Sequence, residues 1–176
     1  LKYRWPTVPV HLTPEQIFYS IIDEEAKIRA RTPYVSKFRN ADFQMNDEER
    51  KEIFIRILGE LGELSRANVM QAFFRSTFEA WKNYNKTGQE KVWVGYTPII
   101  GVDGEKIIND YNGNGYVLHV MRNPFSCYAE TKKRPVPLSL EHYITGWINN
   151  QYYAEYLSKK YPDNFFFVRY EDIIDD

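Results

Sequence analysis

The sequence predicts an α/β fold, and three observations lead to this prediction. The chain has 176 residues, of which 43% are hydrophobic, so it is long enough to form one domain with a hydrophobic core. Three short apolar segments, in "VWVGYTP", "VLHVMRNP" and "FFFVRYEDI", are typical of buried strands that run into polar residues. Helical patterns alternate with strands in the second half of the chain, and this alternation is typical of parallel sheets.

The first half of the chain, residues 1–89, is expected to be helical. Thr13 has the properties of an N-cap, Pro14 suits the first position of a helix, and Gln16 completes a capping box. The first helix should end before Pro33, because the residue before a proline disfavours the helical conformation.

Two further helices are predicted in this half, one beginning near Asn46 and Asp47 and one from about Ser65 to Tyr84. Apolar side chains recur along both at helical spacing, so we expect them to form a core, although the aromatic ones could also line a substrate cleft. These residues are Ile53, Ile57, Leu61, Met70, Phe73, Phe74, Phe78 and Trp81.

The second half, residues 90–176, is expected to hold the sheet, and we treat residues 1–176 as a single domain with residues 1–89 inserted as its helical part. The predicted strands are Lys91–Gly95, Tyr116–Met121 and Asn164–Tyr170. The predicted helices are a short one within "DGEKIINDYNGNG", one from Pro124 to about Lys133, and one from Leu140 to about Tyr161.

The composition excludes several classes of protein and site. The net charge is −1, which gives no argument for nucleic-acid binding, and no apolar run is long enough for a membrane span. His, Cys and Asp do not recur at metal-ligand spacing. Cys127 is the single cysteine and the opening "LKYRWPTVPV" has no signal-peptide pattern, so we expect a soluble, cytoplasmic protein.

A charged elbow follows the strand that ends at Met121. Arg122 stands at the carboxyl end of the strand, Asn123 is a good N-cap, and Pro124 suits the first helical position. Ligands bind outside the carboxyl ends of parallel strands and helix N-termini attract anions, so Arg122 is a candidate phosphate ligand. The alternative is an arginine that pairs with a neighbouring carboxylate.

The three strand segments together resemble the sulfotransferase family over roughly residues 91–176. Members of this family transfer a sulfuryl group from 3′-phosphoadenosine-5′-phosphosulfate (PAPS) to a hydroxyl or amine. The resemblance implies a three-layer parallel sheet with flanking helices, of the P-loop nucleotide-binding type, with a helical insert in the N-terminal half. The family's Gly-rich cofactor loop and its C-terminal lid are missing from the sequence, so we expect the chain to be an excerpt of a longer enzyme.

The resemblance also implies a set of cofactor-binding residues. Arg122 matches the arginine that binds the 3′-phosphate, with the backbone after Asn123 adding donors, and Tyr170 in "VRYEDI" could pack near the adenine. The family's phosphate-binding serine would fall on a glutamate here, Glu130. We therefore expect Ser126 or Thr131 to supply the hydroxyl. We also expect Glu130 to point to solvent or to a basic side chain such as Lys133 or Arg134, and a further departure is Tyr96, where the family has a lysine.

The residue that takes the proton from the acceptor is predicted to be His11, by type and by its position in the chain. Glu24 and Glu25 lie mid-helix, where an exposed face is the default. His119 lies inside a strand and should belong to the core, while His142 should lie on a helix surface.

The sequence therefore predicts a PAPS-dependent sulfotransferase without a metal, acting on a small-molecule or carbohydrate acceptor. Two alternatives stay open. One is a non-catalytic binding module on the same scaffold, which the missing Gly-rich loop and Glu130 favour. The other is a nucleotide-dependent kinase, which the absence of a Gly-x-x-x-x-Gly-Lys motif disfavours.

Overall fold

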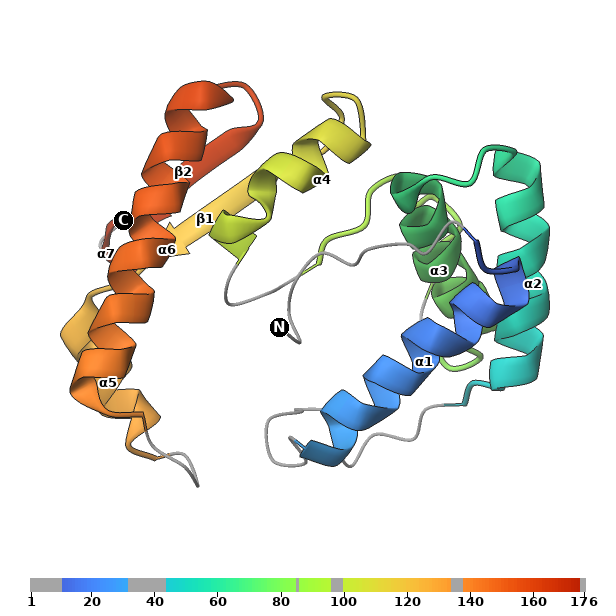
Figure 1. Ribbon diagram of the computed structural model, residues 1–176, viewed down its shortest axis with the longest axis horizontal. Coiled ribbons are helices and arrows are strands. Elements are labelled where there is room, and N and C mark those ends of the chain that lie inside the picture. The colour runs from blue at the N-terminus through green and yellow to red at the C-terminus, as the bar shows by residue number, and fades with distance from the viewer. Residues whose placement is uncertain (1–10, 32–43, 85, 96–99, 134–137, 175–176) are drawn as a thin grey trace. The chain divides into compact units, whose positions relative to one another are not determined.

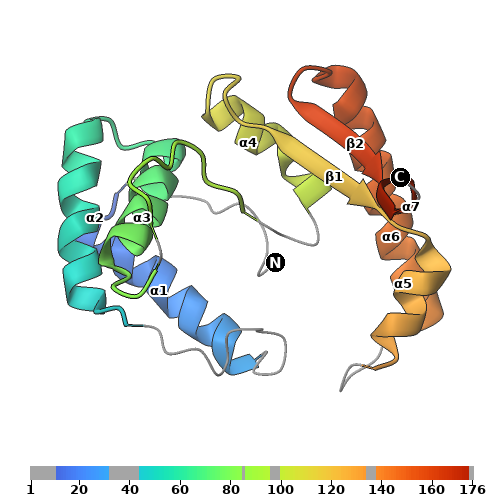
Figure 2. The same ribbon diagram turned by 180° about the vertical axis from the view of Figure 1, so that it is seen from behind.

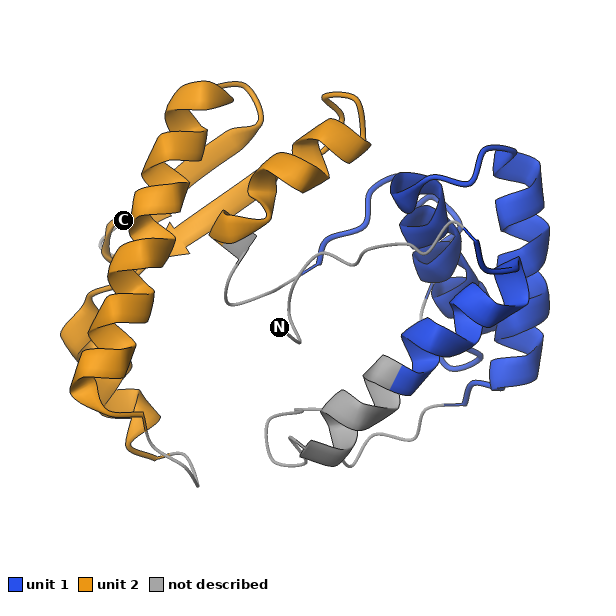
Figure 3. Cartoon of the chain, in the orientation of Figure 1, with its two compact units in different colours: residues 1–2, 6–95 blue, residues 3–5, 96–176 orange. Residues whose placement is uncertain are grey.

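The structure, a computed structural model, describes residues 11–31, 44–84, 86–95, 100–133 and 138–174. The chain divides into two compact units, and the described residues up to Gly95 belong to unit 1 and those from residue 100 onward to unit 2 (Figure 3). The predicted three-layer parallel sheet is wrong. The described residues are mostly helical and contain a single parallel sheet of two strands.

Unit 1 is built from three helices: α1 (Pro14–Arg31), α2 (Asp47–Leu61) and α3 (Arg66–Ala80) (Figure 1). Each begins where its capping signal predicts. The amide of Thr13 donates to Gln16 Oε1 at 3.0 Å and the amide of Gln16 donates to Thr13 Oγ1 at 3.2 Å, which is the predicted capping box. The side chains of Asn46 and Ser65 cap α2 and α3.

The core of unit 1 lies where the three helices meet. Among the predicted core residues, Ile57, Met70 and Phe73 are buried, while Phe74 and Phe78 are only partly buried. Aliphatic and aromatic side chains of all three helices form one cluster, and removing their surface from water drives the association of the helices. The buried members of this cluster are Ile17, Phe18, Phe54, Ile57, Leu58, Val69, Ala72 and Phe73.

A buried arginine lies beside this cluster. The side chain of Arg50 is 1% exposed, and its guanidinium lies 4.2 Å from the ring centroid of Phe73 and 5.9 Å from that of Phe18. Its Nη2 donates to Thr77 Oγ1 at 2.7 Å and its Nη1 lies 3.8 Å from Asp47 Oδ1. Arg50 therefore joins α2 to α3 through both its charge and its apolar stem.

The predicted strand Lys91–Gly95 is wrong, because these residues form no strand. Val92 and Val94 are 81% and 93% exposed, so the apolar alternation does not face a core. Trp93 instead stacks on Phe74 of α3, with the ring centroids 4.2 Å apart. This stacking contact thus holds the segment against α3.

Unit 2 follows the predicted order of strand, helix, helix and strand (Figure 1, and from behind in Figure 2). A short 3-10 turn and a helix precede the first strand, and one turn of helix follows the second. The elements are η1 (Ile100–Val102), α4 (Gly104–Asp110), β1 (Val117–Met121), α5 (Pro124–Thr131), α6 (Leu140–Lys160), β2 (Phe165–Arg169) and α7 (Tyr170–Ile174).

The two strands pair in parallel, from Val117 opposite Phe165 to Met121 opposite Arg169. A parallel pair needs a crossover connection, and α5 with α6 supplies it. Asn164 fixes the register at the start of the sheet, because its Nδ2 donates to the carbonyls of Gly113 and Gly115 at 2.6 Å and 3.1 Å. The amide of Val117 returns a bond to the Asn164 carbonyl at 2.8 Å.

Helices α4 and α6 pack on the sheet, and the buried residues at their contact form the core of unit 2: Ile108, Val117, Ala154, Leu157 and Phe165. Gly104 is required at this contact, because a Cβ there would lie 2.8 Å from the ring of Phe165. The other face of the sheet presents Leu118, Val120 and Phe166, which are all exposed. Within the described residues, no helix has the length and apolar character needed to cross a membrane.

His119 is a buried histidine of this core, as the sequence predicts. Its Nε2 lies 3.0 Å from Oε1 of Gln151, and its ring lies against Phe165 and Phe167. Burial lowers the pKa of His119, because the charged ring would lose its hydration. His119 therefore ties β1 to α6 in its neutral form.

Replacing Arg50 with alanine should destabilise unit 1 by roughly 2–4 kcal/mol, because the change removes aromatic contacts and a hydrogen bond from a charged group. Urea unfolding followed by circular dichroism measures this loss. The matched control is Arg56→Ala on the same helix. Its exposed ion pairs with Glu60 and Glu79 should contribute little to stability. Equal effects of the two substitutions would contradict the assigned role of Arg50.

The stability of unit 2 should fall on acidification, because the unfolded chain protonates His119 at a higher pH than the folded chain does. The contribution of the neutral ring is complete above the ordinary histidine pKa of about 6.5 and is lost progressively below it. Urea midpoints measured between about pH 7.5 and pH 5.5 test this. His119→Gln should reduce the pH dependence, whereas the exposed His142→Gln should leave it unchanged. An unchanged slope in His119→Gln would refute the assignment.

Candidate anion site at the strand ends

The elbow after β1 has the predicted strand–cap–helix geometry. Pro124 occupies the first turn of α5, and the Asn123 Oδ1 accepts from the amides of Phe125 and Ser126 at 2.9 Å and 3.4 Å. The amide of Cys127 donates to the Asn123 carbonyl at 3.1 Å. The first amides of α5 therefore donate to Asn123 itself. The main role of this N-cap is to stabilise the start of the helix.

The parallel register brings the end of β2 to the same edge of the sheet. Met121 lies opposite Arg169, so the residues that follow them, Arg122 and Tyr170, are neighbours. The Cζ of Arg122 lies 5.1 Å from the ring centroid of Tyr170, within the range of a cation–π contact. The structure thus brings together two residues that the sequence assigns to cofactor binding, although they are 48 positions apart.

Glu171, the next residue along, binds the elbow itself. Its Oε1 accepts from the amide of Asn123 at 2.8 Å. This backbone hydrogen bond holds the pKa of Glu171 below its usual range, and the charges of Arg169 and Arg122 act in the same direction. The carboxylate therefore holds the elbow in place.

Arg122 is paired with Glu130. Its Nη1 lies 3.0 Å from the Glu130 Oε1, and the two side chains are 35% and 57% exposed. The hydrogen bond from the guanidinium and the charge of Glu130 raise the pKa of Arg122. Glu130 is partly exposed and meets a basic side chain, as expected, but that side chain is Arg122 and not Lys133, so its carboxylate contacts the candidate phosphate ligand itself. The sequence spacing places Glu130 on α5. Its basic partner depends on the direction in which α5 leaves the strand, and the spacing does not give that direction.

The two candidate hydroxyls differ in their surroundings. Thr131 is buried, and its Oγ1 donates to the Tyr128 carbonyl at 2.7 Å. Ser126 is exposed and lies one turn before Glu130, on the helix face that meets Arg122. Ser126 therefore offers the more accessible hydroxyl to a ligand bound at Arg122. The Thr131 hydroxyl instead forms a hydrogen bond within the end of α5.

The remaining candidate residues belong to other segments of the chain. His11 is an exposed residue of unit 1, just before α1, and stays a prediction as the proton acceptor. His142 is exposed on α6, as the sequence predicts. Among the described residues, no group of His, Cys, Asp and Glu could hold a metal ion. The side chains of Glu24, Glu25, Tyr96 and Arg134 lie outside the described residues.

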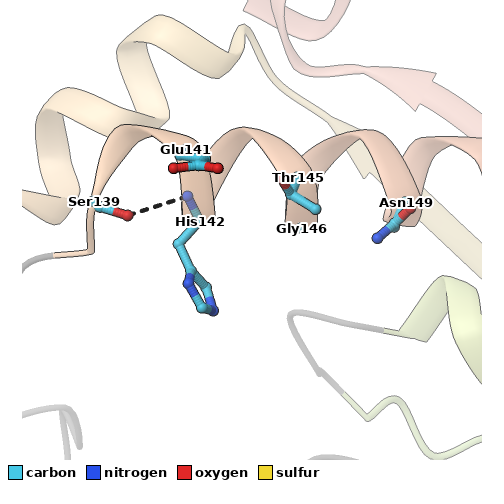
Figure 4. Close-up of a pocket in the computed structure, with 6 residues that line it drawn as sticks. All are labelled: Ser139, Glu141, His142, Thr145, Gly146 and Asn149. Carbon is cyan, nitrogen blue, oxygen red and sulfur yellow. Dashed lines mark hydrogen bonds between the residues drawn. The ribbon is translucent and has the colours of Figure 1, made fainter.

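A hollow lies along the first half of α6 (Figure 4). It has a volume of about 450 Å³, and one face of the helix lines it with polar side chains. The Ser139 Oγ accepts from the amide of His142 at 3.2 Å, which fixes the start of the helix. The lining residues are Ser139, Glu141, His142, Thr145, Gly146 and Asn149. Such hydroxyl, amide and imidazole groups suit a ligand rich in hydroxyls.

Comparisons with models of protein families, with curated proteins and with solved structures find no match for this chain. The resemblance to sulfotransferases therefore rests on the three sequence motifs alone.

Replacing Glu171 with alanine should loosen the elbow, because the Asn123 amide loses its acceptor. Hydrogen exchange of that amide should become faster, and the measurement is residue-resolved exchange by NMR. The wild-type protection should itself be lost only on acidification below the ordinary glutamate pKa of about 4.3, since the folded-state pKa lies below that value and the bond is lost on protonation. Asp172→Ala is the matched control, because Asp172 faces Arg169 at 3.7 Å. Unchanged exchange at Asn123 in Glu171→Ala would contradict this role.

Proposed function

We propose that the protein is a sulfotransferase that transfers a sulfuryl group from PAPS to a hydroxyl or amine, and that Arg122 binds the 3′-phosphate of the nucleotide. The single observation that carries this proposal is the convergence of Arg122 and Tyr170 at the common end of β1 and β2. This edge is where parallel sheets with crossover helices bind their ligands.

The chemistry of the edge suits the nucleotide end of PAPS. A guanidinium is a planar fork that matches two phosphate oxygens, and it stays charged at every physiological pH. The exposed hydroxyl of Ser126 lies on the same side of α5 and adds a neutral donor. The ring of Tyr170 lies beside the guanidinium and offers a flat surface for the adenine. Asn123 contributes by holding the elbow in place.

The transfer step needs groups beyond this edge. Charge that develops on the sulfuryl group must be met by preorganised donors, and the acceptor must lose a proton to a base. We assign the base to His11 and propose a small-molecule or carbohydrate acceptor, for which the polar hollow along α6 is a candidate surface. No metal and no nucleic acid enter this proposal. The single cysteine, Cys127, agrees with a cytoplasmic location.

A non-catalytic binding module is the second candidate function, and the Arg122–Glu130 ion pair favours it. A carboxylate on the guanidinium competes with a phosphate, so a site of this kind could have lost its original ligand. Transfer activity separates the two candidates. Radiolabelled sulfate should pass from PAPS to at least one member of a panel of alcohols, phenols and sugars if the protein is an enzyme.

Arg122→Ala should weaken binding of 3′-phosphoadenosine 5′-phosphate roughly ten- to a hundredfold, as expected for a lost hydrogen bond between charged groups. Binding of 5′-AMP, which has no 3′-phosphate, should change little. Isothermal titration calorimetry measures both. The control is Arg169→Ala, an exposed arginine at the same edge that faces Asp172. Equal losses for the two nucleotides in Arg122→Ala would refute the assignment of the 3′-phosphate to Arg122.

A further inference from the structure

We infer that Glu130 is a specificity-determining residue of the nucleotide site: its carboxylate holds the guanidinium of Arg122 and must be displaced before a 3′-phosphate binds. This inference rests on the proposed function. It adds that the site of this chain discriminates between a 3′-phosphate and a 3′-hydroxyl less strongly than a site with Arg122 alone would.

The position of Glu130 follows from the way α5 begins. The Asn123 cap fixes the first turn of the helix, and Glu130 lies four residues after Ser126, on the same helix face. This face turns toward the end of β1, so the Glu130 Oε1 comes within 3.0 Å of the Arg122 Nη1. The contact is therefore a product of the strand–elbow–helix geometry and not of the loops around it.

The Arg122–Glu130 contact matters because it limits how a ligand can reach Arg122. The guanidinium carbon lies over the ring of Tyr170, 5.1 Å from its centroid, so the ring covers one side of the cation. A phosphate makes its best hydrogen bonds in the plane of the guanidinium, along the N–H edge. Glu130 takes one of these donors, Nη1, at 3.0 Å, so a 3′-phosphate that binds through Nη1 competes with the carboxylate.

Repulsion between like charges adds to the competition between the carboxylate and a 3′-phosphate. A second carboxylate lies at the same edge, because the Glu171 Oε1 accepts from the amide of Asn123, the residue after Arg122, at 2.8 Å. A phosphate that entered beside both carboxylates would be repelled by like charge. A ribose hydroxyl is different, because it donates a hydrogen bond to a carboxylate. Glu130 therefore disfavours a 3′-phosphate while it tolerates, or binds, a 3′-hydroxyl.

The carboxylate is nevertheless able to leave. Glu130 is 57% exposed, and exposed ion pairs contribute little free energy because both ions are well hydrated when they separate. Rotation of the side chain into solvent frees the edge of Arg122 without disturbing the helix. Glu130 thus acts as a displaceable competitor and not as a permanent block.

The test compares Glu130→Gln and Glu130→Ser with the wild-type protein by isothermal titration calorimetry. Both substitutions should tighten binding of 3′-phosphoadenosine 5′-phosphate about two- to fivefold, the fold-change expected from an exposed ion pair. Binding of 5′-AMP should stay the same or weaken. The matched control is Glu155→Gln, which also removes a carboxylate from an exposed ion pair in unit 2, with Lys159 at 2.7 Å. It should change neither affinity.

The outcomes separate this inference from the proposed function when Arg122→Ala is measured beside them. If Arg122→Ala lowers affinity for the bisphosphate alone but Glu130→Gln leaves it unchanged, the competitor role is overturned and the phosphate site stands. Weaker bisphosphate binding in Glu130→Gln would also overturn it, because Glu130 would then hold Arg122 in its binding position. If Arg122→Ala affects both nucleotides equally, the phosphate site and the competitor role fail together.

Discussion

The parallel pairing of β1 with β2 is the constraint on which the rest of unit 2 depends. Two parallel neighbours cannot be joined by a short turn, so α5 and α6 exist as the crossover between them. The same pairing makes both strands end at one edge, which is why Arg122 meets Tyr170 and Glu171 meets the amide of Asn123. A slip of one residue would turn His119 out of the core and separate these contacts.

The strand-end edge is a candidate anion site whose hydrogen-bond donors are already engaged by the protein's own carboxylates. Glu130 neutralises the guanidinium and Glu171 takes the backbone donor of the elbow. Both contacts are accessible to solvent, and the Arg122–Glu130 ion pair is of the exposed kind that contributes little free energy, so a ligand can replace it at small cost. The edge therefore combines a stable backbone with replaceable contacts. A binding site needs both properties, since the backbone must stay in place while the contacts change.

Local signals predicted much of this structure, and non-local contacts explain the rest. The helix starts at Thr13, Asn46 and Ser65 and the elbow at Asn123 follow from side chains that cap neighbouring amides, which a sequence displays directly. The three-layer sheet and the strand Lys91–Gly95 were wrong because a strand needs a partner, and alternation of apolar residues does not specify one. The Arg122–Tyr170 contact was not predicted, because it depends on the pairing of two distant strands, and the partner of Glu130 depends on the direction of α5.

The bond between Asn164 and the Gly113 carbonyl has a kinetic consequence, because it joins positions 51 residues apart. Closing a loop of that length costs chain entropy before any strand contact repays it. The helices of unit 1, by contrast, are capped by residues two or three positions away and can form as soon as their segments collapse. The register of unit 2 therefore costs more chain entropy to establish than the helix caps of unit 1 do.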